Sequence, residues 1–140
     1  MIIRSVLAIL LSASISTTFA ETPLPEDINI IVPTPDTPQS ISAFSGKWTG
    51  QWANTLDHTL IVERVEERKI TLVYSFGVAP TWGIHSSGHL RTTGIVADDG
   101  SLRATLPNGA EVTYRLSTDQ KTIFGEFLLK GRLTKGTLIR

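Results

Sequence analysis

The sequence contains no cysteine. Disulfide bonds, thiol catalysis and attachment of a lipid to a cysteine are therefore excluded. The fold must depend on its apolar core for stability, which for an exported chain fits a bacterial periplasm better than an animal extracellular fluid.

Long apolar runs are also missing. The strongest run, residues 6–11, is far shorter than the roughly 20 residues that a membrane-spanning helix needs. It follows Arg4 and precedes the small residues Thr18 and Ala20, the order found in a cleavable signal peptide. We therefore predict a signal peptide at 1–20, release without a membrane span, and a secreted or periplasmic protein that begins at Glu21.

Proline is confined largely to one segment, since five of the seven prolines precede Phe44. Residues 21–43 also contain acidic side chains and no Lys or Arg. This composition predicts an acidic, proline-rich linker in a semi-extended conformation. Two states remain open for it: a frayed tail, which we favour, and a segment whose apolar residues 28–32 dock along an edge of the barrel predicted below.

Motifs for catalysis and cofactor binding are scarce as well. There is no Gly-x-Ser-x-Gly elbow and no phosphate-binding glycine loop. His85 and His89, four residues apart at the start of a strand, would lie roughly 13 Å apart in extended chain, too far for one metal ion. The mild basic excess after Phe44 forms no cluster of the kind that binds nucleic acid. We predict no enzyme, no metal, no cofactor and no nucleic-acid partner.

Short segments rich in Val, Ile, Thr, Tyr, Phe and Trp follow one another after Phe44, and turn signals separate them. They predict eight strands, at 46–53, 58–66, 69–76, 88–96, 101–106, 110–116, 122–128 and 132–139. Because the connections are short, each strand pairs with its sequence neighbours in an antiparallel meander. Closure of the meander removes the edges, so residues 44–140 are predicted to form an all-β, eight-stranded up-and-down barrel. A two-sheet sandwich is the alternative.

Alternation within the strands assigns side chains to the two faces of the barrel. The predicted inward set is almost entirely apolar: Trp48, Trp52, Leu60, Val62, Ile70, Leu72, Tyr74, Leu102, Ala104, Val112, Tyr114, Leu116, Ile123 and Phe127. Four apolar residues would face outward: Ile61, Val73, Phe124 and Leu128. They indicate either scattered surface residues, which we favour, or a face covered by a partner or a second copy.

The run Phe44-Ser45-Gly46-Lys47-Trp48-Thr49-Gly50 resembles the first strand of the calycins, the group that contains lipocalins and avidins. The resemblance implies that Trp48 plugs one end of the barrel and that an arginine of the last strand, Arg140 or Arg132, packs on its ring. It does not extend to biotin binding, because Gly50 occupies the position of a polar ligand-binding residue.

The loop 77–87 places Trp82 between Pro80 and Gly83, at one end of the predicted barrel. Ligands of barrels bind at such mouths. Trp82 is therefore either a lid over a ligand or a cover for core atoms. The predicted ligand-binding residues are Trp52, Tyr74, Trp82, His85, Arg91 and Tyr114.

Two functions remain open from the sequence. In the first, the barrel binds a small apolar or amphipathic molecule at its mouth, oriented by a few polar side chains. In the second, a filled barrel without a ligand serves as a non-catalytic interaction module for a protein of the cell envelope. An open interior would favour the first.

Overall fold

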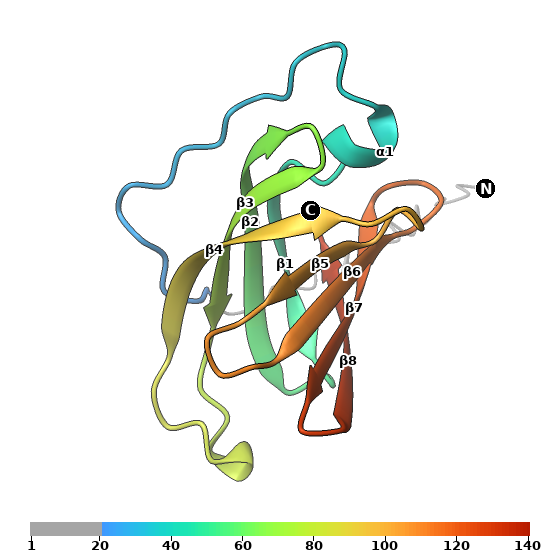
Figure 1. Cartoon of the computed structure of the whole chain (residues 1–140). Helices are drawn as coiled ribbons and strands as arrows, with labels where there is room; N and C mark the ends of the chain where they lie inside the picture. The colour runs from blue at the N-terminus through green and yellow to red at the C-terminus, as the bar shows by residue number, and fades with distance from the viewer. Residues whose placement is uncertain (1–20) are drawn as a thin grey trace, which may run out of the picture.

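A computed structural model describes residues 21–140, so the predicted signal peptide lies outside the described residues. Eight strands in this range form one closed antiparallel barrel in which each strand pairs with its sequence neighbours and the last closes on the first (Figure 1). The strands are β1 (Gly46–Trp52), β2 (Leu56–Glu66), β3 (Lys69–Phe76), β4 (Gly88–Val96), β5 (Leu102–Thr105), β6 (Glu111–Leu116), β7 (Thr122–Leu129) and β8 (Arg132–Ile139). The predicted all-β, eight-stranded up-and-down barrel is confirmed.

The first hairpin is tighter than predicted. Ala53 and Asn54 both have positive φ, 47° and 54°, the combination of a type I′ turn. Leu56 consequently pairs with Trp52, and β2 begins two residues earlier than the sequence pattern indicated. Leu56 is buried, so the early start adds an apolar side chain to this end of the barrel.

One end of the barrel is closed by the chain that leads into β1. A short helix, α1 (Gln39–Ser42), lies over this end, and Phe44 behind it is fully buried (Figure 1). The Trp48 ring is also fully buried, and its Nε1 donates a hydrogen bond to the Phe44 carbonyl at 2.9 Å. The guanidinium carbon of Arg140 lies 4.1 Å from the centroid of the Trp48 ring, a cation–π geometry.

Arg140 also fixes the chain at the closed end. It donates hydrogen bonds to the carbonyls of Ser45, at 3.0 Å, and of Ala43. Arg132, the other candidate for this contact, begins β8 at the opposite end of the barrel. The closed end is thus held by Arg140, in contact with both the ring and the backbone.

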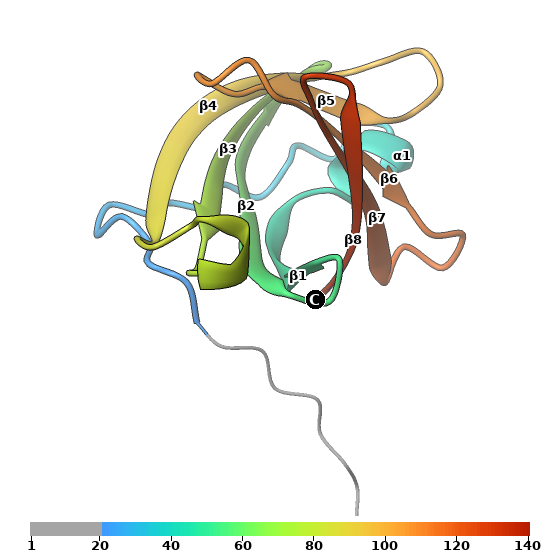
Figure 2. The same ribbon diagram turned by 90° about the horizontal axis from the view of Figure 1, so that it is seen from below.

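The opposite end is open. The turns β1–β2, β5–β6 and β7–β8 and the longer loop 77–87 all lie here, and η1 (Pro80–Trp82) stands at the rim (Figure 2). Within loop 77–87, Ala79 and Ile84 form an isolated antiparallel bridge, and Gly83 adopts a left-handed φ of 76°. The bridge gives this loop a defined shape at the barrel mouth.

Residues 22–31 form a strap on the outside of β2 and β3 instead of a frayed tail. The buried Thr22 hydroxyl donates to the Thr59 hydroxyl at 2.7 Å, and the Ser75 hydroxyl donates to the Pro23 carbonyl. Farther along, the Ile31 N–H donates to the Glu63 carbonyl at 2.7 Å. The strap therefore runs from the open end of the barrel toward the closed end.

The strap is held mainly by polar groups and backbone, not by the apolar patch that suggested docking. Ile30, Ile31 and Val32 remain 42%, 39% and 83% exposed. Most of the expected apolar patch therefore stays in solvent, and only Ile28 at its start is half-buried.

A β-bulge in β2 provides the central anchor of the strap. The register with β3 shifts between Val62 and Arg64, which leaves Glu63 as an extra residue. The Glu63 carboxylate accepts hydrogen bonds from the Asn29 N–H at 2.9 Å and from Arg91 Nε at 2.6 Å. Arg91 also forms an ion pair with Asp27 at 3.1 Å, so it joins strap and sheet.

The four apolar residues expected on the outer face have two different fates. Ile61 and Val73, only 1% and 0% exposed, lie outside the inner core cluster on the face that the strap crosses. Phe124 and Leu128, on β7, are 53% and 38% exposed. The chain thus supplies the cover for the first pair itself and leaves the second pair in solvent.

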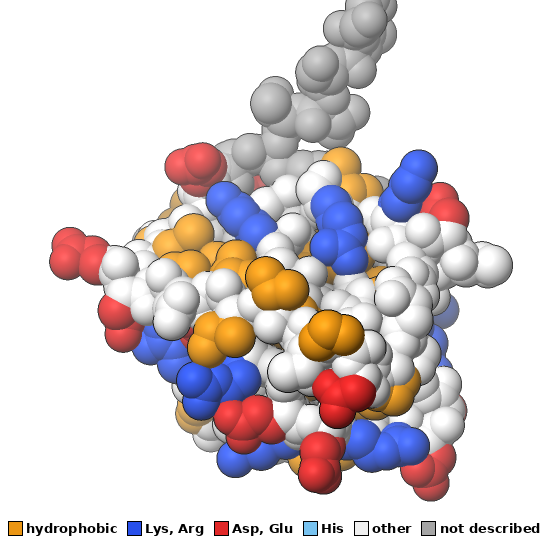
Figure 3. Space-filling view, turned by 90° about the horizontal axis from the view of Figure 1, so that it is seen from above, with side chains coloured by type: hydrophobic (Ala, Val, Ile, Leu, Met, Phe, Trp, Pro, Cys, Tyr) orange, Lys and Arg blue, Asp and Glu red, His pale blue; other side chains and the backbone are white. Residues whose placement is uncertain are grey.

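Residues 21–140 contain no helix long and apolar enough to cross a membrane. Figure 3, a view onto the closed end, shows acidic and basic side chains interspersed with small apolar patches. This face is therefore not dominated by charge of one sign.

Candidate binding cavity

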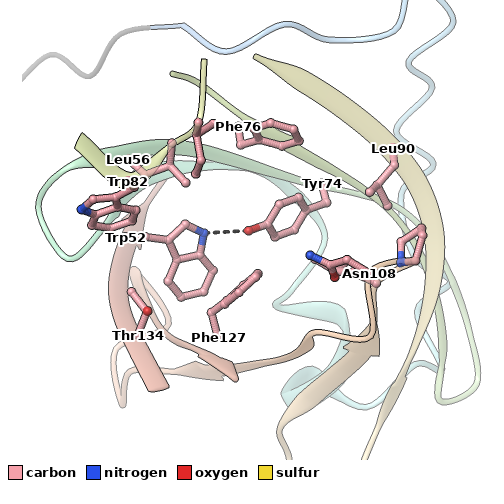
Figure 4. A pocket seen from close by; sticks show the side chains of 12 residues that line it. Trp52, Leu56, Tyr74, Phe76, Trp82, Leu90, Asn108, Phe127 and Thr134 are labelled. Atoms are coloured by element: carbon pink, nitrogen blue, oxygen red, sulfur yellow. Dashed lines mark hydrogen bonds between the residues drawn. The ribbon is translucent and has the colours of Figure 1, made fainter. Parts of the chain in front are cut away.

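The open half of the barrel contains a cavity of about 430 Å³. Its volume lies within the range of about 300–1,000 Å³ that is usual for small-molecule sites. Figure 4 shows side chains from both sides of the barrel facing this space. The lining residues are Trp52, Leu56, Tyr74, Phe76, Trp82, Ile84, Leu90, Leu106, Pro107, Asn108, Phe127 and Thr134.

Trp52 forms one wall of the cavity because the two strands next to it, β8 and then β7, carry glycine where its ring lies. A Cβ on Gly125 would lie 2.8 Å from a Trp52 ring carbon, and one on Gly136 would lie 2.7 Å from another. These separations are shorter than van der Waals contact, so only glycine permits the indole to lie flat against β7 and β8. The ring also meets Phe127 edge-on, with centroids 5.8 Å apart.

Tyr74 crosses the cavity from β3 toward Trp52. Trp52 Nε1 donates a hydrogen bond of 2.9 Å to the Tyr74 hydroxyl (Figure 4). Burial raises the pKa of Tyr74, so its phenol keeps its proton throughout the physiological range. The Tyr74 hydroxyl is therefore a neutral polar group inside an apolar space.

A buried histidine lies behind this wall. His58 stacks on Trp52, with centroids 5.2 Å apart, and lies 4.2 Å from the Tyr74 ring. Its Nδ1 is 2.7 Å from the Ser75 carbonyl, and its Nε2 is 2.8 Å from the Tyr114 hydroxyl. Because a carbonyl can only accept, Nδ1 carries the proton, and the Tyr114 hydroxyl donates to Nε2.

Burial lowers the pKa of His58 to about 4 and raises the pKa of Tyr114 well above its ordinary value. Both groups are therefore neutral at physiological pH. The pair satisfies its own polar atoms and supports the Trp52 and Tyr74 rings from below. It is not among the residues that line the cavity.

The mouth of the cavity is bordered by loop 77–87. Trp82 and Ile84 line the space, and Trp82 is 41% exposed at the same time. Trp82 therefore faces both the cavity and the solvent, at the position that a lid residue would occupy. On the opposite rim, Pro107 and Asn108 belong to the β5–β6 turn.

The structure brings together three of the six predicted binding residues: Trp52, Tyr74 and Trp82 all line the cavity. Tyr114 is fully buried one layer below, where it hydrogen-bonds to His58. His85 is exposed in loop 77–87 and does not line the cavity.

Arg91 lies on the outside of the barrel, contrary to its expected place at the mouth. Its neighbour Leu90 faces the cavity, and alternation along β4 turns Arg91 outward to the strap. Hydrogen bonds from Arg91 lower the pKa of Glu63, so the ion pair beneath the strap is charged. The same alternation rule, applied to β4, would have placed Arg91 correctly.

Several lining residues were not predicted as binding residues. Phe76 and Leu90 continue the inward pattern of β3 and β4, so alternation could have found them. Asn108 was interpreted only as a turn residue. Its direction depends on the conformation of the β5–β6 turn, which sequence pattern does not specify.

No protein-family model and no curated protein matches the sequence. Among solved structures, the barrel is similar to the solution structure of a lipocalin described as the product of a gene activated by cell transformation with the myc oncogene. The sequences are 14% identical, the match covers 79% of this chain and 73% of that chain, and the TM-score is 0.41.

Proposed function

We propose that this protein is a non-catalytic binding protein that encloses one small, largely apolar molecule in the open half of its barrel. The observation that carries the proposal is the cavity of about 430 Å³, lined by aromatic and aliphatic side chains and open at one end. Transfer of apolar ligand surface from water into this space would supply the binding free energy, at roughly 25 cal/mol per Å².

The alternative function, a filled barrel that acts only as an interaction module, requires a packed interior. The closed half is packed around Phe44 and Trp48, but the open half is not. The cavity therefore favours ligand binding.

We further propose that the protein acts after export, in the periplasm or outside the cell. The basis is the signal-peptide pattern of residues 1–20. Amino-terminal sequencing of the protein recovered from its own host tests this part independently of binding. A chain that begins at Glu21 would support it, and a retained Met1 would contradict it.

The binding proposal is tested by titration with N-phenyl-1-naphthylamine, an uncharged dye whose fluorescence rises in apolar surroundings. Leu90 lines the cavity from β4, so Leu90→Trp should fill part of the space and weaken dye binding at least tenfold. Ile95→Trp is the matched control, because Ile95 is on the same strand but 56% exposed. Dye binding that is absent from the wild type, or unchanged in Leu90→Trp, would refute the proposal.

A further inference from the structure

The lining of the cavity contains no charged side chain among the described residues. Arg91, which could have compensated an anionic ligand, points away from the cavity and is paired with Glu63 and Asp27. A carboxylate or ammonium group enclosed without a partner loses its hydration at a cost that apolar contacts do not repay. The cavity is therefore suited to an uncharged ligand.

Hydrogen bonding inside the cavity is unbalanced. A tyrosine hydroxyl has one hydrogen to donate and lone pairs to accept. The Tyr74 oxygen accepts from Trp52 Nε1, and no described residue accepts the Tyr74 hydrogen. The Tyr74 hydroxyl can therefore still donate its hydrogen to a molecule in the cavity.

Asn108 presents the same kind of group from the opposite rim. Its Oδ1 accepts the backbone N–H of Ala110 at 3.0 Å, which orients the amide. The Nδ2 group then retains its donors, and no described residue accepts them. Figure 4 shows the Tyr74 hydroxyl and the Asn108 amide directed into the same space.

Taking the binding function above as the basis, we infer that the ligand is an uncharged, largely apolar molecule that carries a hydrogen-bond acceptor such as a carbonyl or ether oxygen. Tyr74 and Asn108 donate to that oxygen, and the aromatic and aliphatic walls contact the remainder. Thr134, whose hydroxyl can donate or accept, is a further polar group of the lining. Acceptor recognition, rather than charge, then provides specificity.

Three probes of the same ring system and similar size test this inference: 2-acetylnaphthalene, 2-ethylnaphthalene and 2-naphthoate, measured by displacement of N-phenyl-1-naphthylamine at pH 7. One net hydrogen bond contributes about 0.5–1.5 kcal/mol, so the ketone should bind about two- to tenfold more tightly than the ethyl compound. The anionic naphthoate should bind at least tenfold more weakly than the ketone.

Variants assign the preference to the two donors. Asn108→Asp keeps an oxygen for the Ala110 N–H but removes the amide donors, so the preference for ketone over ethyl compound should fall toward unity. Asn54→Asp is the matched control, since it makes the same change in another mouth turn without altering the cavity lining. Tyr74→Phe, which leaves Trp52 Nε1 without an acceptor, should also reduce the preference, with thermal unfolding measured to verify the fold.

The outcomes separate this inference from the binding function. If the dye itself does not bind, so that there is nothing for the probes to displace, the proposed function fails. If the ethyl compound binds as tightly as the ketone, or the naphthoate binds most tightly, the cavity is a binding site but the inferred ligand class is wrong. A ketone preference that persists in both Asn108→Asp and Tyr74→Phe would also overturn it.

Discussion

Acidification should destabilise this protein through one buried side chain, His58. Protonation would place a charge where the ring is 1% exposed and packed against Trp52 and Tyr74. It would also turn Nε2 into a donor that faces the Tyr114 hydroxyl, which would have to reverse its own hydrogen bond. The fold therefore selects the neutral imidazole.

The size of the effect follows from the difference between two pKa values. Burial lowers the pKa of His58 from 6.5 to about 4. Because the unfolded chain binds the proton more tightly, the free energy of unfolding is fully retained above about pH 6.5 and declines as the pH falls toward 4. A gap of about 2.5 pKa units corresponds to a loss of about 3 kcal/mol.

Urea unfolding followed by tryptophan fluorescence at several pH values between 7 and 4.5 measures this loss. His58→Gln should be less stable at pH 7 but should have a much flatter pH profile. His85→Gln removes an exposed histidine and serves as the control. Hydrogen bonds from Arg91 lower the pKa values of Glu63 and Asp27. The stability contributed by these two carboxylates is therefore lost at a lower pH than the stability contributed by neutral His58. Equal pH slopes in the wild type and His58→Gln would refute the reasoning.

Two further predictions concern the cavity wall and the strap. Gly125→Ala should push the Trp52 ring into the cavity. Dye titration should then show weaker binding, and urea unfolding should show a loss of stability of about 1–3 kcal/mol. Unchanged dye binding would contradict this account of the wall. Arg91→Met should leave the Glu63 carboxylate without its cation. Amide hydrogen exchange should then increase in residues 22–31 more than in the barrel strands. Equal increases in both regions would show that the strap does not open separately.

The barrel was predictable because its information is local. Alternation placed Trp48, Leu60 and Leu72 inside, and each is fully buried. Turn residues at Gly100 and Gly109 marked two hairpins correctly, and both glycines have the positive φ that such turns require. Eight short strands with short connections leave few ways to pair other than a closed meander.

The cavity and the strap depend on relations that local pattern does not contain. The position of Trp52 requires glycine at Gly125 and Gly136. Both lie on strands that follow Trp52 by roughly 70 residues or more. The strap depends on Glu63, whose bulge is not visible in the alternation of β2. Whether an interior is open or filled is decided by such long-range packing, which composition does not reveal.

The plug formed by Phe44, Trp48 and Arg140 determines how a bound molecule would exchange. Since this end of the barrel is sealed, arrival and departure share one route past Trp82 and the neighbouring turns. A bound molecule would block the entry of a second one. Delivery to a partner would therefore be limited by the rate of ligand dissociation and would require the open rim to face that partner. Motion of loop 77–87 would then change the residence time more than the equilibrium affinity.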